Sequence, residues 1–365
     1  MISSTPFAQL PDDFQLAYQP QVPRETPPSI GLIGCGGITG IHLKAYRDAG
    51  WPVVALCDLD PEKAENRRSE FFPEAKTYTD YKDLLRNEEI GVVDIALHTR
   101  FRPPVISDAI LAGKHVLSQK PFVDDLEVGQ SLVDLADQHE VTLAVNQNGR
   151  WAPHFSYMRQ AVASGLLGHL MSINFSVHWD HTWVKGTAFE TMEQLVLYDY
   201  AIHWFDMVHN LFIDQPPQRV FATRRMTATQ TISPPLLAAV LVESEHAIAN
   251  VAFVAQTSHL ARDRSFLAGS NGSIVSWGPD EKNQTLQIET EAGRYQPHLE
   301  GQWFPDAFRG TMAELLCSLE EKRPCQLAAA DNLKSLELCF AAVASSMTEQ
   351  PVKVGSVRKL QSEWL

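Results

Sequence analysis

Residues 30–40 read Ile30-Gly31-Leu32-Ile33-Gly34-Cys35-Gly36-Gly37-Ile38-Thr39-Gly40, and this stretch decides the fold. Its first four residues are mostly apolar and predict a short buried strand. The glycine cluster predicts a tight turn, and a helical pattern then runs through Ile41, Leu43 and Tyr46 to Gly50. Gly34 and Gly36 can adopt backbone angles closed to other residues and let a phosphate approach the main chain. The free N–H groups at the start of the helix would then face that phosphate.

A carboxylate follows at the distance that a dinucleotide-binding unit requires. The apolar run 53–57 predicts a second strand and ends in Asp58, 22 residues after Gly36. This is where such a fold places the acid that holds the adenine-side ribose. The sequence therefore predicts bound NAD rather than NADP, because a carboxylate repels a 2′-phosphate. Thr39 occupies the third glycine position of the fingerprint, so the helix–strand packing must fit an extra hydroxyl or shift slightly.

Composition excludes several classes of protein. Lys and Arg number 30 against 44 Asp and Glu, a net charge of −14, which argues against general nucleic-acid binding. Neither a run long enough to span a bilayer nor a signal-peptide pattern is present, and residues 1–28, rich in proline, are interpreted as an extended arm. An odd number of cysteines without CxxC spacing predicts a reduced, cytoplasmic protein: Cys35, Cys57, Cys317, Cys325 and Cys339.

Strand and helix patterns alternate up to about residue 150. Strands are predicted at 92–97, 115–118 and 141–145, and helices at 61–72, 103–112 and 125–139. This alternation predicts an α/β Rossmann domain with a parallel sheet over residues 29–150. Ligands bind at the carboxyl ends of such strands. The candidate residues there are Gly34, Gly36, Gly37, Ile38, Asp58, His98, Thr99, Gln119, Lys120, Asn146, Asn148 and Arg150.

The alternation of strand and helix patterns does not continue in residues 151–365. A helix at about 155–167 precedes an alternating strand at 171–178, and six more strand-like runs follow between residues 219 and 289. Helices are predicted at 306–321 and 331–347. Consecutive strands with short turns predict a C-terminal α+β domain with an open, mostly antiparallel sheet.

A helix predicted over residues 192–212 places Asp199, His203 and Asp206 on one face. The simplest alternative is a hydrogen-bonded core histidine. A metal site is a second alternative, helped by His178, Asp180, His181 and His209. We predict no metal, since His209 lies six residues from His203 and so not on the same helical face.

Lys120 follows a strand and precedes Pro121. There it can donate to a substrate hydroxyl and stabilise the oxyanion that forms as a hydride leaves. Taken alone, the position favours a surface lysine at a strand end.

Together these motifs resemble the glucose–fructose oxidoreductase/inositol dehydrogenase (Gfo/Idh/MocA) family over about residues 29–355. The resemblance rests on the glycine turn, Cys57-Asp58, Ala112-Gly113-Lys114-His115-Val116-Leu117 leading to Lys120-Pro121, the Asp199/His203/Asp206 helix and the turn Gly269-Ser270-Asn271-Gly272. It implies a nicotinamide-binding domain, a sheet domain that packs against another subunit in a dimer or tetramer, and Lys120, Asp199 and His203 as the catalytic group.

The chain departs from the family pattern beside these residues. Gln119 stands where the family usually has glutamate, and Leu97-His98-Thr99-Arg100-Phe101-Arg102 replaces the usual Thr-Pro-Asn-x-x-His. The arginines of this loop could recognise an anionic or strongly polar group.

The resemblance and the residues lead to the expectation of an NAD-dependent dehydrogenase acting on a secondary hydroxyl of a sugar, cyclitol or close derivative. Two alternatives are an NAD-recycling enzyme that cleaves glycosides by oxidation and elimination, and a non-catalytic regulator that senses NAD or sugar. Candidates for holding the substrate are Asn146, Asn148, Arg150, Trp179, Trp183, Asp199 and His203.

Overall fold

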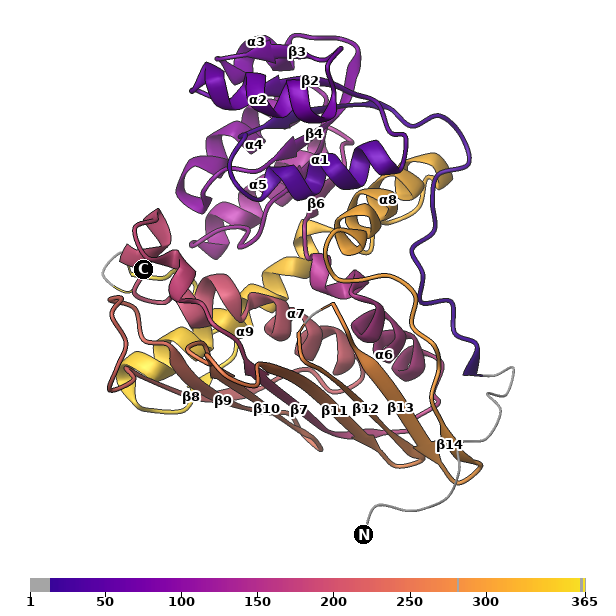
Figure 1. Cartoon of the computed structure of the whole chain (residues 1–365), viewed down its shortest axis with the longest axis vertical. Helices are drawn as coiled ribbons and strands as arrows, with labels where there is room; N and C mark the ends of the chain where they lie inside the picture. Colours follow the sequence, from indigo (N-terminus) through magenta and orange to yellow (C-terminus); the bar gives the residue numbers. More distant parts are fainter. Residues whose placement is uncertain (1–13, 281, 362–363, 365) are drawn as a thin grey trace. The chain divides into compact units, whose positions relative to one another are not determined.

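The computed structural model describes residues 14–280, 282–361 and 364, which form two compact units (Figure 1). The parallel-sheet unit comprises Pro20–Trp151 and Phe304–Leu333. The antiparallel-sheet unit comprises the described parts of residues 1–19, 152–303 and 334–365.

The predicted parallel sheet is confirmed. Its six strands lie in the order β3-β2-β1-β4-β5-β6, and helices flank them along the chain. The order reverses between β1 and β4, which creates the crevice where doubly wound sheets bind ligands. The strands are β1 (Ser29–Ile33), β2 (Val53–Cys57), β3 (Lys76–Tyr78), β4 (Ile90–Ile95), β5 (His115–Ser118) and β6 (Leu143–Val145), and the helices are α1 (Thr39–Asp48), α2 (Pro61–Phe71), α3 (Tyr81–Leu85), α4 (Arg102–Leu111) and α5 (Leu126–Gln138). The short, largely exposed β3 was not predicted, since it has no apolar run.

Aspartate caps fix the starts of several helices. The side chains of Asp60, Asp80 and Asp125 accept hydrogen bonds from backbone N–H groups in the first turns of α2, α3 and α5 at 2.8–3.0 Å. Each cap satisfies a donor that the helix leaves unpaired, which is why these starts were predictable from sequence.

Helix α8 (Asp306–Glu321) groups with the parallel sheet, whereas the sequence assigned residues 304–333 to the second domain. Phe308, Met312 and Leu316 share a core cluster with Leu43 and Tyr46 of α1. Helices α1 and α8, far apart in sequence, thus share one buried apolar cluster, and no local sequence pattern predicts that they pack together.

The antiparallel-sheet unit contains nine strands in the order β14-β13-β12-β11-β7-β10-β9-β8-β15, and β7 and β10 are its parallel neighbours. The predicted open, mostly antiparallel sheet is confirmed. Helices α6, α7 and α9 lie along one face (Figure 1). The strands are β7 (Leu170–His178), β8 (Arg219–Arg225), β9 (Leu237–Glu243), β10 (Ile248–Val254), β11 (Arg262–Gly269), β12 (Gly272–Gly278), β13 (Thr285–Thr290), β14 (Gly293–Tyr295) and β15 (Val352–Lys353), and the helices are α6 (Pro153–Ala163), α7 (Ile202–Leu211) and α9 (Ala329–Thr348).

The predicted helix over 192–212 is divided. A π-helical segment, η6 (Leu195–Tyr200), precedes α7, and the N–H of Ala201 donates to the carbonyl of Val196 at 2.7 Å. Such wide turns frequently lie at functional sites. The segment holds Asp199, so the regular 100° spacing assumed from the sequence does not apply between Asp199 and His203.

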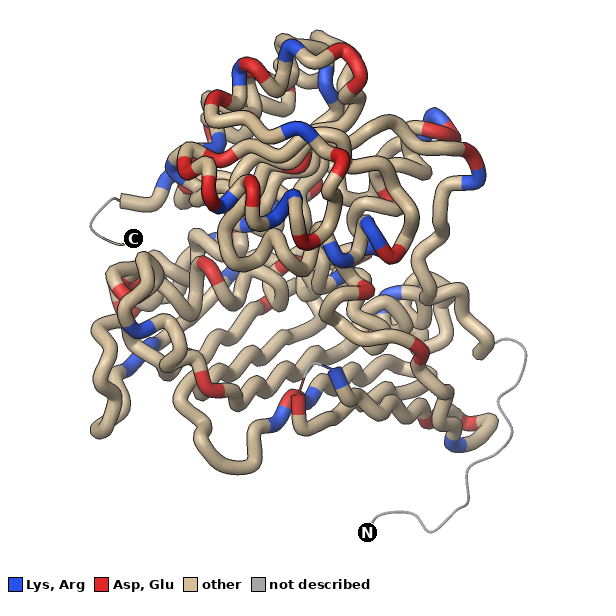
Figure 2. The backbone as a smooth tube through the Cα atoms, turned by 45° about the horizontal axis from the view of Figure 1, so that its top comes forward, with Lys and Arg blue, Asp and Glu red and all other residues tan. Residues whose placement is uncertain are grey.

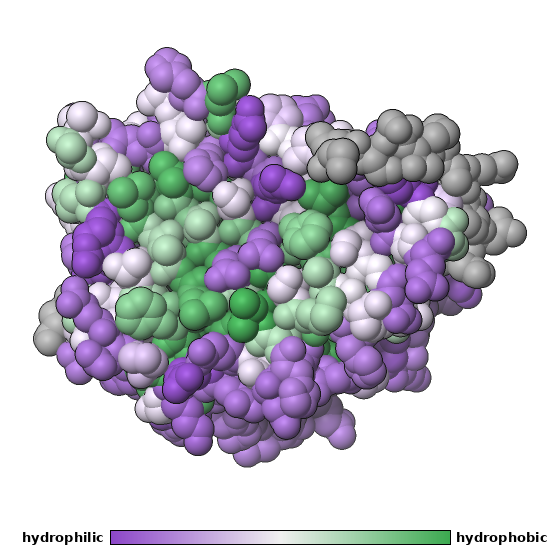
Figure 3. All heavy atoms as spheres, turned by 90° about the horizontal axis from the view of Figure 1, so that it is seen from below, coloured by the Kyte–Doolittle hydropathy of each residue, from purple (hydrophilic) through white to green (hydrophobic). Residues whose placement is uncertain are grey.

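The other face of this sheet presents apolar side chains. Cross-strand pairing aligns Phe221, Leu241, Asn250, Asn174, Phe266 and Val275 in one row. Figure 2 shows few charged residues along the middle of the strands, and Figure 3 shows apolar residues gathered on this face. Ile248 and Phe221 remain 45% and 41% exposed.

The arm predicted over residues 1–28 is described from Phe14 onward; residues 1–13 lie outside the described part. Ser156 Oγ donates to the carbonyl of Tyr18 at 2.6 Å, and Gln19 Nε2 donates to that of Glu300 at 2.9 Å. Residues 14–19 therefore run along the antiparallel-sheet unit of the same chain.

The burial of His154 makes the stability of the fold depend on pH. It is fully buried near the start of α6, with its ring 4.1 Å from that of Phe155, and burial lowers its pKa to about 3. Unfolding restores the usual pKa near 6.5, so the unfolded chain binds the proton first as pH falls. The free energy of unfolding should drop by about 3 kcal/mol between pH 7 and pH 4 from this residue.

Urea denaturation of wild type and His154→Phe across this range measures the effect. The carboxylates common to both proteins cancel in the difference. If the free energy of unfolding depended on pH equally in the two proteins, the lowered pKa of His154 would be contradicted.

Candidate active site

The glycine turn follows β1 and needs glycine at one position for steric reasons. Gly34 has φ +94°, and a Cβ there would lie 2.7 Å from the carbonyl oxygen of Ala96. Gly36 and Gly37 differ, because a Cβ on either would have no atom of the described chain within 4 Å. Gly34 is thus fixed by the sheet, while Gly36 and Gly37 border open space at the start of α1.

Thr39, at the third fingerprint position, has its hydroxyl hydrogen-bonded within the turn. Its buried hydroxyl donates to the carbonyl of Gly36 at 2.7 Å. Arg67 of α2 donates to the carbonyls of Gly36 and Gly37 at 3.1 and 3.3 Å. The turn is therefore held through its carbonyls. Ile38, next in the chain, is the N-cap of α1 and packs against the core beneath it.

Asp58 lies at the carboxyl end of β2 and is linked to the turn. Its Oδ2 accepts from the N–H of Cys35 at 2.7 Å, and its Oδ1 accepts from the N–H of Asp60 at 2.9 Å. The side chain is only partly buried. Burial and the Asp58 charge raise the pKa of the Cys35 thiol to about 12, so the thiol stays neutral beside the turn.

These residues fit a dinucleotide. The room around Gly36 and Gly37 lies at a helix N-terminus, where N–H groups and the helix dipole favour a pyrophosphate. Asp58 keeps lone pairs for a ribose diol.

The carboxyl ends of β4 and β5 carry the next predicted residues. His98 is exposed as the N-cap of the short helix η2 (Thr99–Phe101), and Arg100 lies over the ring of Phe101 at 4.6 Å. Thr99 Oγ1 donates to the carbonyl of Pro121 at 3.3 Å. The backbone N–H of Lys120 donates to Gln119 Oε1 at 2.7 Å, and Lys120 is partly exposed.

Arg102 has a different role from the anion recognition considered for this loop. Its side chain is 0% exposed and donates to the carbonyls of Gln119 and Pro121, and to Thr99 Oγ1 at 2.6 Å. A guanidinium has a planar set of donors suited to several acceptors at once. Arg102 therefore holds the chain on both sides of Lys120.

The residues after β6 are buried. Asn146 is 0% exposed, and Asn148 and Arg150 are each 2% exposed on η3 (Asn148–Trp151). Arg150 donates to the carbonyl of Gln326 at 2.5 Å and pairs with Asp331 at 2.9 Å. These contacts give Arg150 a place in holding η3 within the parallel-sheet unit.

In the antiparallel-sheet unit, His203 projects from α7 among aromatic rings. It is 8% exposed, and its ring lies 5.5 Å from Trp303 and 6.4 Å from Trp204. Asp199, on η6, is partly exposed and helps to raise the pKa of the buried Cys339 thiol, after the larger effect of burial. Asp206 is 1% exposed and accepts from Ser335 Oγ at 2.8 Å, which identifies it as a hydrogen-bonded core residue.

Trp179 and Trp183 occupy different environments. Trp179 follows β7, and its ring lies 5.5 Å from that of Tyr200 and 5.8 Å from that of Trp204. Trp183 is 60% exposed. Trp179 thus belongs to the same aromatic cluster as Trp204, next to His203 on α7.

Within the described residues, no group of three or more His, Cys, Asp or Glu side chains is placed to hold a metal ion. Nor does that part of the chain contain a helix long and apolar enough to cross a membrane.

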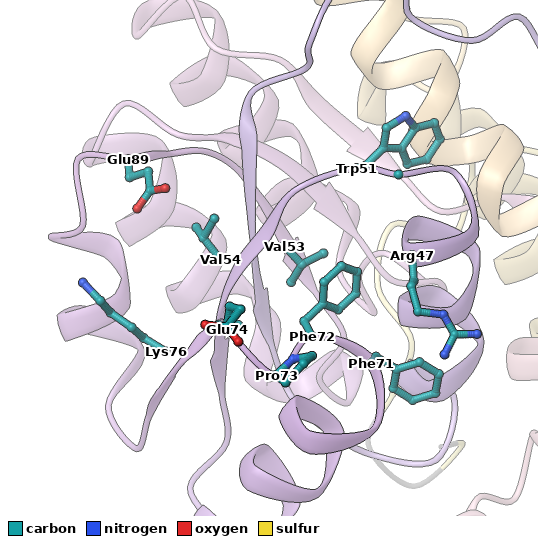
Figure 4. A pocket seen from close by; sticks show the side chains of 12 residues that line it. Arg47, Trp51, Val53, Val54, Phe71, Phe72, Pro73, Glu74, Lys76 and Glu89 are labelled. Carbon is teal, nitrogen blue, oxygen red and sulfur yellow. The ribbon is translucent and has the colours of Figure 1, made fainter.

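A separate pocket of about 520 Å³ lies at the opposite edge of the parallel sheet (Figure 4). Trp51, Val53 and Phe72 line it, with Arg47 and Lys76 beside them. These residues stand at or near the amino ends of β2 and β3, whereas ligands of such sheets bind at the carboxyl ends.

Sequence reasoning missed buried polar residues near Lys120: Arg102 binds the carbonyls of Gln119 and Pro121, and His42 contacts Asp94 at 2.7 Å and Gln119 at 3.2 Å. Arg102 was considered only for ligand recognition, and His42 and Asp94 were not considered at all. One signal was present: Asp94 interrupts the apolar strand 92–97, and a charged residue in a buried strand requires a partner.

Comparison with known proteins agrees with this geometry. The model of the oxidoreductase family with an NAD-binding Rossmann fold matches residues 29–147, and that of the Gfo/Idh/MocA C-terminal domain matches residues 155–275. The chain belongs to the Gfo/Idh/MocA family of oxidoreductases, and its parallel-sheet unit is an NAD-binding Rossmann domain.

Curated relatives include a D-apiose dehydrogenase from Paraburkholderia graminis, 29% identical over 64% of this chain and 61% of that protein. An inositol 2-dehydrogenase from Salmonella typhimurium is 27% identical over 57% of this chain and 61% of that protein. The matched region thus spans about 61% of each relative. A solved oxidoreductase from Agrobacterium radiobacter, in complex with NAD+, L-tartaric acid and magnesium, has the same fold with a TM-score of 0.82 at 20% identity, covering 91% of this chain and 99% of that one.

Proposed function

We propose that this protein is an NAD-dependent dehydrogenase that oxidises a secondary hydroxyl of a sugar, cyclitol or close derivative. The observation that carries the proposal is the position of Lys120. It follows β5 at the carboxyl edge of the Rossmann sheet, where the neighbouring β4 pairs with the β1 strand that leads into the glycine turn. The sugar and inositol dehydrogenases among its relatives support the substrate class.

The roles of the residues follow from their chemistry. When bound, NAD accepts a hydride from the carbinol carbon. Lys120 donates a hydrogen bond to the reacting oxygen and stabilises its negative charge. His203 accepts the hydroxyl proton as general base, and Asp199 orients His203 or binds a neighbouring hydroxyl. Asn148 and Trp179 contribute to holding the polyol.

The cofactor residues serve recognition. Gly36, Gly37 and Ile38 offer main-chain N–H groups to the pyrophosphate, and Asp58 accepts from the ribose diol. His98 and Thr99 border the crevice at the end of β4, and Gln119 follows β5 with its side chain 7% exposed. The five buried thiols, none in a disulfide, support the proposal of a cytoplasmic protein.

A substrate panel tests the proposal. The protein is mixed with NAD or NADP and with sugars, cyclitols and their acids, and reduced nicotinamide is followed by absorbance. We expect one substrate group to be oxidised, with kcat/KM for NAD at least about tenfold above that for NADP, and Asp58→Ala to narrow this ratio.

The possible failures of this panel differ in meaning. Product without net NADH, and with cofactor retained through purification, would indicate oxidation–elimination of a glycoside instead. NADH binding without any turnover would contradict an enzymatic role and favour a regulator.

We further propose a homo-oligomer that buries the face of the antiparallel sheet opposite to helices α6, α7 and α9. The cross-strand row supports this. Two apolar pairs, Phe221–Leu241 and Phe266–Val275, flank the hydrogen-bonded Asn250 and Asn174, and exposed apolar surface of this kind marks interaction sites. We expect a dimer or tetramer by light scattering, and Phe266→Lys to raise the dissociation constant at least about tenfold.

Leu59→Lys is the matched control, since Leu59 is 89% exposed and lies in the other unit. A wild-type monomer at micromolar concentration would contradict this proposal.

A further inference from the structure

A buried chain of hydrogen bonds ends at the backbone of Lys120. His42 Nδ1 lies 2.7 Å from Asp94 Oδ2, and His42 Nε2 lies 3.2 Å from Gln119 Nε2. The other amide atom of Gln119, Oε1, accepts from the Lys120 N–H at 2.7 Å. His42 and Asp94 are 0% exposed and Gln119 is 7% exposed, so water does not compete for these bonds.

The contacts fix where the proton of His42 resides. A carboxylate only accepts, so Nδ1 donates to Asp94 and carries the hydrogen. Nε2 faces the amide nitrogens of Gln119 and, at 3.5 Å, of Asn146, both of which only donate. Nε2 is therefore an acceptor, and His42 is neutral.

The amide orientation of Gln119 is fixed from the opposite side. Reversing the amide would point its NH2 group at the Lys120 N–H, placing donor against donor. The Lys120 N–H thus orients Gln119, and Gln119 in turn requires a lone pair on His42 Nε2. Arg102 adds a second restraint by binding the carbonyls of Gln119 and Pro121, which flank Lys120.

We propose that His42 and Gln119 are positioning residues that hold Lys120 in its reactive place, and that the neutral, Nδ1-protonated His42 is the form that does so. The inference rests on the proposed role of Lys120 in the reaction. Neither residue is proposed to contact substrate. A displacement of the lysine by about 1 Å would cost up to about 100-fold in rate.

The amide at residue 119 explains why the neutral form is the one selected. A glutamate would still accept from the Lys120 N–H, but its second oxygen would face His42 Nε2 and require a proton there. His42 would then be an imidazolium between two carboxylates. Its contacts are Asp94 on β4, Gln119 after β5, Asn146 after β6, Tyr46 on α1 and Phe308 on α8, and among these described contacts Asp94 carries the charge.

Two variants at residue 119 separate positioning from general stability. Gln119→Met keeps the length of the side chain but removes both hydrogen bonds, and we expect kcat to fall about 10- to 100-fold with KM and NADH affinity within about threefold. Gln119→Glu restores an acceptor for Lys120, so its kcat at low pH should approach wild type. At higher pH the lone pair of Nε2 opposes the carboxylate introduced at residue 119, and kcat should fall along a limb that wild type lacks.

Tyr46→Phe is the matched control. It removes the other hydrogen bond to Asp94, 2.7 Å long, and leaves the His42–Gln119–Lys120 branch intact. We expect a lower Tm with kcat within about twofold of wild type, since the lost bond does not reach Lys120. Equal losses of kcat in Tyr46→Phe and Gln119→Met would overturn the inference, as would a Gln119→Glu profile identical to wild type.

Failure of the proposed function gives a different result. If Lys120→Ala kept full turnover, the proposed catalytic role of Lys120 would be wrong. If Lys120→Ala were inactive while Gln119→Met had wild-type kcat, the function would stand and the positioning role would be wrong.

Discussion

Lys120→Ala is expected to lower kcat by about 10³-fold, because it removes the cation proposed to stabilise charge on the reacting oxygen. Binding of NADH should change by less than about threefold, since the proposed recognition of the cofactor rests on the glycine turn and Asp58 and not on the lysine side chain. Steady-state kinetics on the best substrate of the panel, with NADH fluorescence titration, measures both quantities.

Two controls sharpen this result. Lys44, an exposed lysine on α1, pairs with Asp48 at 2.5 Å and is 49% exposed, so Lys44→Ala should leave kcat unchanged. Lys120→Arg keeps the positive charge but not the compact ammonium, and should recover only part of the loss. Wild-type turnover in Lys120→Ala would contradict the proposed mechanism.

Gly34→Ala is expected to destabilise the protein by about 3 kcal/mol, because a Cβ at φ +94° would be strained and would meet the carbonyl of Ala96 at 2.7 Å. Relief by backbone movement is costly, since the Gly34 N–H donates to Cys57 and the Ala96 N–H donates to Ile33, each at 2.8 Å. Urea denaturation of the two proteins measures the loss.

Gly36→Ala separates binding from folding. A Cβ there meets no described atom within 4 Å, so the free energy of unfolding should stay within about 0.5 kcal/mol of wild type. NADH affinity should nevertheless fall about tenfold, because the methyl group occupies room left for the pyrophosphate. Equal stability of Gly34→Ala and wild type would show that the turn is not under the steric restraint described.

Much of the fold was predictable because the deciding signals are local. The glycine turn, the aspartate caps at Asp60 and Asp125, and the apolar runs at 53–57 and 115–118 specify their elements through neighbours within a few residues. The change from alternating strands and helices to consecutive strands near residue 150 predicted the second sheet for the same reason.

The candidate site was predictable only as a set of residue types. Lys120, Asp199 and His203 were selected by their positions after a strand and along a helix. The π-helical segment that holds Asp199 was not expected, since residues 195–200 contain no glycine or proline to mark it.

By itself, the sequence determined most of the helices and strands, the alternation that makes the first half a parallel sheet, and the acid that follows β2, because each depends on local pattern and spacing. Only the tertiary structure decided which polar groups are partners. His42 contacts Asp94 and Gln119, which lie 52 and 77 residues away in the sequence. Arg102, on α4, binds the carbonyls on either side of Lys120. Such pairings are set by burial, which forces each polar group to find an acceptor or donor wherever the folded chain supplies one.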